Sequence, residues 1–101
     1  MAKDNELFNK IIIEKILECE KVIGEKDAKL LQNIEKFGGV EACRNVLKRR
    51  QYSKCFNKLK DKGRLDLSME AVVVDSRFSK LFDDDEVNFC FETLCDNGYF
   101  N

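Results

Sequence analysis

The stretch from Gly38 to Val74 has the sequence GGVEACRNVLKRRQYSKCFNKLKDKGRLDLSMEAVVV, and its glycines and apolar spacing decide the fold. Glycine readily adopts the left-handed conformation that ends helices, so Gly38-Gly39 is predicted to end one helix and begin the next. Between this pair and Gly63, apolar residues recur at three- and four-residue steps, as in helices with one buried face. The stretch therefore predicts two consecutive short helices, the second of them capped at its N-terminus by Ser53.

The next segment carries the most distinctive motif of the chain, Gly-Arg-Leu-Asp-Leu-Ser at positions 63–68. Residues 64–67 alternate polar and apolar side chains and are too few for a helix, so they predict an extended linker whose leucines enter the core. Ser68 is placed to cap a further helix that ends near Asp75. The three consecutive valines of this helix are β-branched residues that favour strands. A short strand at 70–74 is therefore the alternative.

On the N-terminal side, residues 6–23 form a broad apolar stripe at helical spacing. Gly24 interrupts the stripe, and the same spacing resumes up to Phe37. We therefore expect a helical hairpin over residues 1–37. A glycine costs a helix only about 1 kcal/mol, so one continuous helix through Gly24 is the alternative.

On the C-terminal side, Asp83 and Glu86 have the spacing of a capping box, and Asn97-Gly98 is expected to end the helix that follows. The predicted buried face of this helix consists of Val87, Cys90, Phe91, Leu94 and Cys95. The chain is thus expected to form a single all-α domain over residues 1–101, a compact bundle of about six short helices. Within it, residues 38–101 form the module that follows the hairpin.

Composition supports a globular domain. Of the 101 residues, 44% are hydrophobic and 37% are charged, which suits one core beneath well-solvated helix faces. The longest apolar runs are far too short to cross a membrane, and the N-terminus lacks the pattern of a signal peptide. We therefore expect a cytoplasmic protein with no membrane partner.

The cysteines are expected to be free thiols. Their number is odd, none forms a Cys-x-x-Cys pair, and the chain has no histidine, so neither a disulfide framework nor a zinc site is predicted. Each is interpreted as a small buried apolar side chain. The five are Cys19, Cys43, Cys55, Cys90 and Cys95. No metal and no cofactor are expected.

A wider pattern surrounds the motif at positions 63–68. It consists of Gly38-Gly39-x-Glu41-Ala42, Phe56-x-x-Leu59, Gly-Arg-Leu-Asp-Leu-Ser-x-Glu at 63–70, and Leu81-Phe82-x-x-x-Glu86. In this pattern, about half of the chain resembles a small bacterial helical module that occurs in uncharacterised proteins. The resemblance implies a helical module of unknown activity, found in some proteins beside nuclease-like or defence-type domains. It brings no catalytic residues with it.

The charges are strongly segregated along the chain. Residues 1–43 carry seven basic and nine acidic side chains, residues 44–64 carry nine and one, and residues 65–101 carry two and nine. The basic segment is a candidate for binding a phosphate backbone, with Asn45 and Gln51 placed to reach base edges. The alternative is that the acidic last third neutralises it within the fold. The candidate nucleic-acid residues are Arg44, Lys48, Arg49, Arg50, Lys54 and Lys58.

A second polar group is interpreted as structural. We expect Arg64 to form an internal ion pair with Asp66 or Glu70, next to the Ser68 cap, because the planar guanidinium braces carboxylates well. The acidic run at 83–86 is expected to stabilise a helix N-terminus rather than to hold a metal ion.

Catalysis is not expected. Without histidine, Ser–His and Cys–His nucleophile pairs are excluded, and no phosphate-binding glycine loop is present. The leading hypothesis is a small non-catalytic interaction module that binds an unknown protein partner or a second copy of itself. The candidate partner surface is formed by apolar residues that the last helix does not obviously bury, namely Phe89, Tyr99 and Phe100. The alternative is a DNA- or RNA-binding accessory protein that uses the basic helices.

Overall fold

Six α-helices and two short 3-10 turns make up the computed structural model, which describes the backbone of residues 2–100 and the side chains of residues 5–100. No strand occurs in this part of the chain. The helices are α1 (Ala2–Ile23), α2 (Ala28–Phe37), α3 (Gly39–Lys48), α4 (Phe56–Asp61), α5 (Met69–Val73) and α6 (Asp84–Asp96). The turns are η1 (Leu65–Leu67) and η2 (Ser79–Leu81). The predicted all-α bundle is confirmed.

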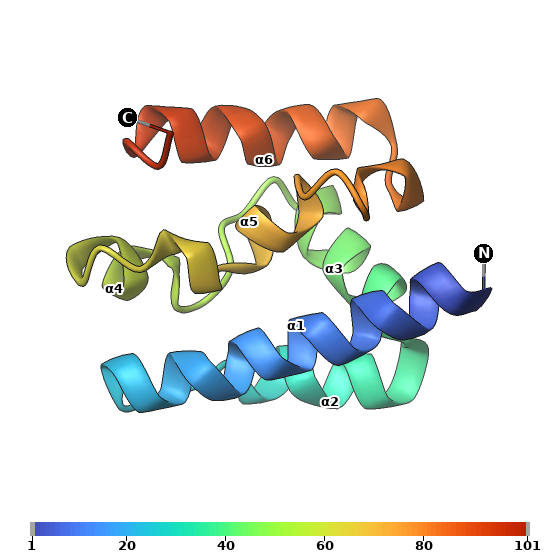
Figure 1. Ribbon diagram of the computed structural model, residues 1–101, viewed down its shortest axis with the longest axis horizontal. Coiled ribbons are helices and arrows are strands. Elements are labelled where there is room, and N and C mark those ends of the chain that lie inside the picture. The colour runs from blue at the N-terminus through green and yellow to red at the C-terminus, as the bar shows by residue number, and fades with distance from the viewer. Residues whose placement is uncertain (1, 101) are drawn as a thin grey trace.

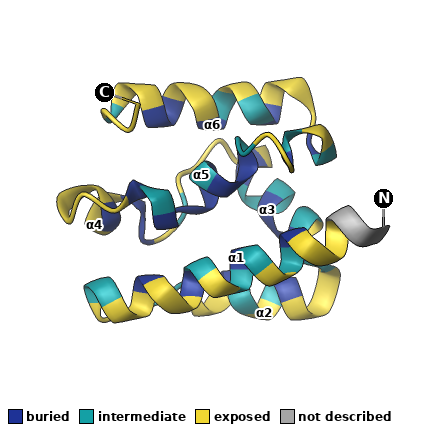
Figure 2. Ribbon diagram, viewed as in Figure 1, coloured by how far each residue is buried: buried dark blue, intermediate teal, exposed yellow. Residues whose placement is uncertain are grey.

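The helices lie in three layers (Figure 1). The antiparallel hairpin of α1 and α2 forms one side, α6 forms the opposite side, and α3, α4 and α5 lie between them. Gly24 ends α1 with φ +78°, so the chain turns back here and does not continue as one long helix. Most residues of the central helix α5 are buried and are coloured dark in Figure 2. The ring of Phe8 lies at the centre, edge-on to Phe78 at 5.3 Å and to Phe82 at 5.4 Å.

The glycine pair behaves as its sequence predicts and has a second role in packing. Gly38 takes φ +90° and donates its N–H to the Ile34 carbonyl at 2.8 Å, which ends α2. Gly39 begins α3 and donates its N–H to Asn9 Oδ1 at 2.6 Å. A Cβ on Gly39 would lie 2.5 Å from that oxygen and 2.9 Å from Phe8 Cδ2. Only glycine therefore lets α1 approach this junction so closely.

Three local predictions in the middle layer need correction. Helix α4 begins at Phe56, not beside Ser53, and its N-cap Cys55 makes no side-chain capping bond. Residues 64–67 include the tight turn η1 and are not an extended linker, although both of its leucines are buried as expected. The alternative strand at 70–74 is wrong because this segment belongs to α5 and the turn after it.

Helix α5 forms despite its valines for two reasons. Ser68 caps it, since its Oγ accepts the Ala71 N–H at 3.2 Å. Val72 and Val73 are buried against the core, and that burial outweighs the weak helix propensity of β-branched residues.

Helix α6 begins with the predicted capping box, in which the Glu86 carboxylate accepts the Asp83 N–H at 2.8 Å. Its predicted buried face was too wide. Phe91 is 49% exposed and Cys95 is exposed, whereas Cys90 and Leu94 are fully buried. Thr93 takes a place in the interior because its hydroxyl donates to the Phe89 carbonyl at 2.7 Å.

Glu70 explains why Ser53 does not cap α4. The Glu70 side chain is 0% exposed, and its two carboxylate oxygens accept the N–H and the hydroxyl of Ser53, both at 2.8 Å. These two bonds fix the connection between α3 and α4 to the central helix α5. Burial raises the pKa of Glu70 above its ordinary value of 4.5, and the bonds from Ser53 oppose that rise.

Replacing Glu70 by glutamine is expected to change how stability depends on pH. The unfolded chain loses the Glu70 proton near pH 4.5, whereas the folded chain keeps it to higher pH. Glu70 therefore makes folding less favourable as pH rises from about 4.5 through the folded-state pKa. Glu70→Gln lacks this titration, so its free energy of unfolding relative to wild type should rise across that window. Urea unfolding at a series of pH values measures this difference, and a constant difference at every pH would contradict it.

Ser53→Ala tests the same contact from the other side. It leaves one oxygen of a buried carboxylate without its donor, so a loss of about 1–3 kcal/mol in the free energy of unfolding is expected at neutral pH. Ser76→Ala, at an exposed serine, is the matched control. Equal stability of the two variants in urea unfolding would show that the Ser53 hydroxyl does not matter.

Candidate functional site

The six basic candidates do not form one surface. Arg44 contacts the start of α6, where its Nε lies 3.1 Å from Glu86 Oε2 and its second guanidinium nitrogen lies 3.0 Å from Asp83. The hydrogen bond to Glu86 raises the pKa of Arg44. Lys58 pairs with Glu25, the residue after Gly24 in the connection from α1 to α2. Both cations thus make ion pairs within the fold, and their assignment to a nucleic-acid surface stays a prediction.

Arg50, two residues after the end of α3, has an unusual backbone conformation. Its φ of +55° makes it the one non-glycine residue with positive φ in the described chain. Its guanidinium lies 5.7 Å from the centre of the Phe89 ring, an arrangement in which cation and aromatic ring attract each other. Lys48, Arg49 and Lys54 are exposed, and none of them makes an ion pair with any described residue.

Two of these three exposed cations line a groove of about 290 Å³ between α2 and the connection from α3 to α4, which we call the basic groove. Arg49 and Lys54 lie on one side, and Lys29 of α2 lies on the other. One carboxylate, Asp27, also lines the groove, but it accepts the Leu30 N–H at 3.1 Å as the N-cap of α2. The remaining lining residues are Leu30, Asn33, Asn45, Val46, Gln51, Tyr52 and Ser53.

The sequence indicated only part of this groove. Asn45 and Gln51 lie in it together with two of the predicted cations. Lys29 and Asn33 were missed, although their four-residue spacing places them on one face of α2. Nothing in the sequence shows which loop that face meets, because the meeting depends on how the hairpin packs on α3.

The predicted polar cluster divides into separate parts. Arg64 pairs with Asp66 at 3.1 and 3.2 Å, and both side chains are 44% exposed, so the ion pair lies at the surface and not inside. The hydrogen bond from Arg64 lowers the pKa of Asp66. Ser68 caps α5, and Glu70 holds Ser53 instead of joining the arginine.

The three aromatic candidates also separate. Phe89 is half-buried against the core, and its ring lies 6.5 Å from that of Tyr52, so it is not part of a free partner surface. Tyr99 and Phe100 are exposed beyond the end of α6. The ring of Phe100 stacks on that of Phe91 at 4.9 Å and meets Tyr99 edge-on at 5.0 Å. The exposed cluster is therefore Phe91, Tyr99 and Phe100.

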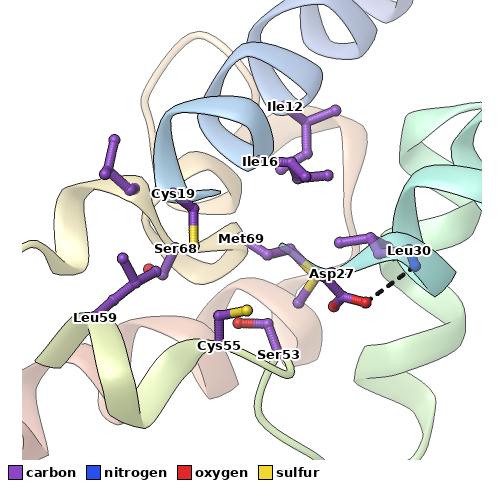
Figure 3. A pocket seen from close by; sticks show the side chains of 11 residues that line it. Ile12, Ile16, Cys19, Asp27, Leu30, Ser53, Cys55, Leu59, Ser68 and Met69 are labelled. Carbon is purple, nitrogen blue, oxygen red and sulfur yellow. Dashed lines mark hydrogen bonds between the residues drawn. The ribbon is translucent and has the colours of Figure 1, made fainter. Parts of the chain in front are cut away.

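A second hollow lies inside the bundle and is lined mainly by apolar side chains and two thiols (Figure 3). Its volume is about 20 Å³, room for about one water molecule. Cys19 and Cys55 face it, and burial raises the pKa of the Cys19 thiol to about 12 and that of Cys55 above its ordinary value. Such thiols are rarely ionised near neutral pH and behave as apolar side chains.

Neither a metal cluster nor a membrane span occurs within the described chain. No three histidine, cysteine, aspartate or glutamate side chains of these residues gather closely enough to hold a metal ion. No described helix combines the length and apolar composition that crossing a bilayer requires.

Arg44→Gln is expected to lower the free energy of unfolding, because Arg44 holds α3 to α6. It removes both contacts to the α6 capping box and leaves the mostly buried Glu86 without its cation, a loss of about 1–3 kcal/mol. Lys48→Gln, at the exposed end of the same helix, should change stability by less than about 0.5 kcal/mol. Thermal and urea unfolding of both variants checks this. Similar free energies of unfolding for the two variants would mean that the ion pairs of Arg44 contribute nothing to stability.

No protein-family model, no curated protein and no solved structure matches this chain. The resemblance of residues 38–86 to a bacterial module therefore stays a prediction. The two surface features on which a function can be built are the basic groove and the exposed aromatic cluster.

Proposed function

We propose that the protein is a non-catalytic binding protein that takes single-stranded nucleic acid in the basic groove. The observation that supports this proposal is the convergence of Lys29, Arg49 and Lys54 on one concave surface. Lys29 belongs to α2, whereas Arg49 and Lys54 belong to the connection between α3 and α4. None of the three makes an ion pair with a described residue. Cations held ready in this way suit the phosphates of a backbone.

The shape of the groove favours a single strand over a duplex. Duplex DNA is usually recognised by a helix or ribbon that protrudes into a groove, whereas a concave surface receives unstacked nucleotides. Asn33, Asn45 and Gln51 offer donors and acceptors for base edges. Tyr52 is 47% exposed at the rim while its ring rests on Phe56 at 4.9 Å, which suits stacking on a base.

The net charge of −1 is compatible with this proposal because the charges are separated in space. Helix α6, which carries five of the carboxylates, lies in the layer opposite α2 (Figure 1). A local positive field acts within about a Debye length, roughly 8–10 Å at physiological salt, so distant acidic residues weaken it little. A cytoplasmic location, where nucleic acids are abundant and thiols stay reduced, fits the same proposal.

The double variant Arg49→Glu/Lys54→Glu tests the groove. Binding of a fluorescent single strand of about 20 nucleotides should fall about tenfold or more, and log Kd should depend less steeply on log salt by about one unit per lost contact. Lys60→Glu/Lys62→Glu makes the same charge change on exposed residues outside the groove and should retain most of the affinity. Anisotropy titrations at about 50 and about 200 mM salt measure all three proteins.

Two results would overturn the proposal. Absence of binding by the wild-type protein at the lower salt concentration would remove nucleic acid as the ligand. Equal loss in both double variants would show that any positive charge serves, and that the groove is not the site. A duplex of the same length, titrated alongside, is expected to bind more weakly than the single strand.

A further inference from the structure

Helix α6 carries negative charge at both ends, and only the charge at its N-terminus suits the helix dipole. Its 13 residues include five carboxylates and no lysine or arginine. Asp84, Asp85, Glu92 and Asp96 are exposed and make no ion pair with a described residue. The first two suit the positive end of the helix dipole, but Asp96 lies in the last turn, where a negative charge is unfavourable.

The exposed aromatic cluster adjoins the carboxylates at the C-terminal end of α6. Phe91, Tyr99 and Phe100 are 49%, 36% and 50% exposed, and the ring of Phe100 contacts both of the others. Tyr99 also lines a hollow beside Leu65 and Asp66 of η1. Glu92 follows Phe91 directly and both are exposed, and Asp96 is the last, exposed residue of α6. Together the three aromatic residues, Glu92 and Asp96 form a projecting apolar group beside negative charge, which we call the aromatic-acidic surface.

The basic groove has the complementary chemistry. Its apolar lining is provided by Leu30 and Val46, and cations from α2 and from the α3–α4 region surround it. An aromatic side chain placed on such a floor would bring neighbouring carboxylates close to Lys29, Arg49 or Lys54. Burying the ring supplies apolar contact, and the charge pairs set its orientation.

The two surfaces cannot meet within one chain. Helix α6, which carries the aromatic-acidic surface, and α2, which forms one wall of the basic groove, lie in opposite layers (Figure 1). We propose that the aromatic-acidic surface of one copy docks in the basic groove of a second copy. Such a head-to-tail contact leaves one free surface at each end of the pair, so it extends into short chains instead of closing as a symmetric dimer.

Sedimentation of the unmodified protein gives the first test. At about 50 mM salt the mean mass should rise steadily with concentration beyond that of a dimer, and at about 0.5 M salt it should return to the monomer because the charges are screened. A monomer at every concentration would overturn the proposal, and so would a plateau at the dimer, which indicates a symmetric contact. This test needs no variant, so it stands even where a variant fails to fold.

Reversed charges give the second test. Arg49→Glu/Lys54→Glu makes the groove acidic, and Glu92→Lys/Asp96→Lys makes the other surface basic. Each variant alone should associate about tenfold or more weakly than wild type, whereas an equimolar mixture should associate again because opposite charges then face each other. A mixture that stays monomeric, or a single variant that associates like wild type, would overturn the proposal. Asp96→Lys also removes an unfavourable helix-end charge, so that variant should unfold at or above the wild-type temperature.

The test of self-association can be distinguished from the test of nucleic-acid binding. The α6 variant leaves the basic groove intact, so its affinity for a single strand should equal or exceed that of wild type. Loss of self-association in this variant with nucleic-acid binding retained supports the head-to-tail contact. Self-association of the wild type without any nucleic-acid binding would leave this inference standing and remove only the proposed function.

Discussion

The contact between Glu70 and Ser53 holds the middle of the molecule together. A carboxylate with no exposed surface is tolerated only when its oxygens are satisfied, and here both of its bonds come from one residue of an otherwise irregular connection. The connection between α3 and α4 is thereby fixed to the shortest helix of the bundle. Lys54 follows Ser53 directly and Arg49 begins the same connection, so this buried contact helps to position both surface cations.

The cations of the basic segment serve two purposes, since some form ion pairs within the fold and others face solvent. Arg44 and Lys58 form ion pairs between elements that are distant in the sequence. Arg44 joins α3 to α6, and Lys58 joins α4 to the turn of the hairpin. Arg49 and Lys54 keep their charges for the solvent. Arg44 and Lys58 belong to helices α3 and α4, whereas Arg49 and Lys54 lie in the connection between these helices. Charge counted along the chain therefore overstates the charge that a ligand meets.

Which contacts the sequence could predict depended on how far apart the two residues lie along the chain. The Ser68 cap and the Asp83–Glu86 capping box join residues three positions apart, and their spacing was sufficient to predict both. The contacts that decide the rest join residues 17, 30 and 42 positions apart, namely Ser53–Glu70, Asn9–Gly39 and Arg44–Glu86. No spacing rule relates such pairs. For the same reason Lys29 and Asn33, which line the groove, were missing from the predicted nucleic-acid residues. Arg49, Lys54, Asn45 and Gln51 were included because all four belong to the basic segment.

The glycines differ in a way that matters for genetic suppression. A side chain at Gly39 collides with named atoms of Asn9 and Phe8, so second mutations that shrink residues 8 and 9 can relieve the collision. At Gly24, Gly38 and Gly63 an added Cβ would meet no atom within 4 Å, and their constraint is a φ between +70° and +90°. No change in a neighbour restores that conformation. Revertants of Gly39 mutants should thus include second-site changes in α1, whereas those of the other three should arise at the same codon.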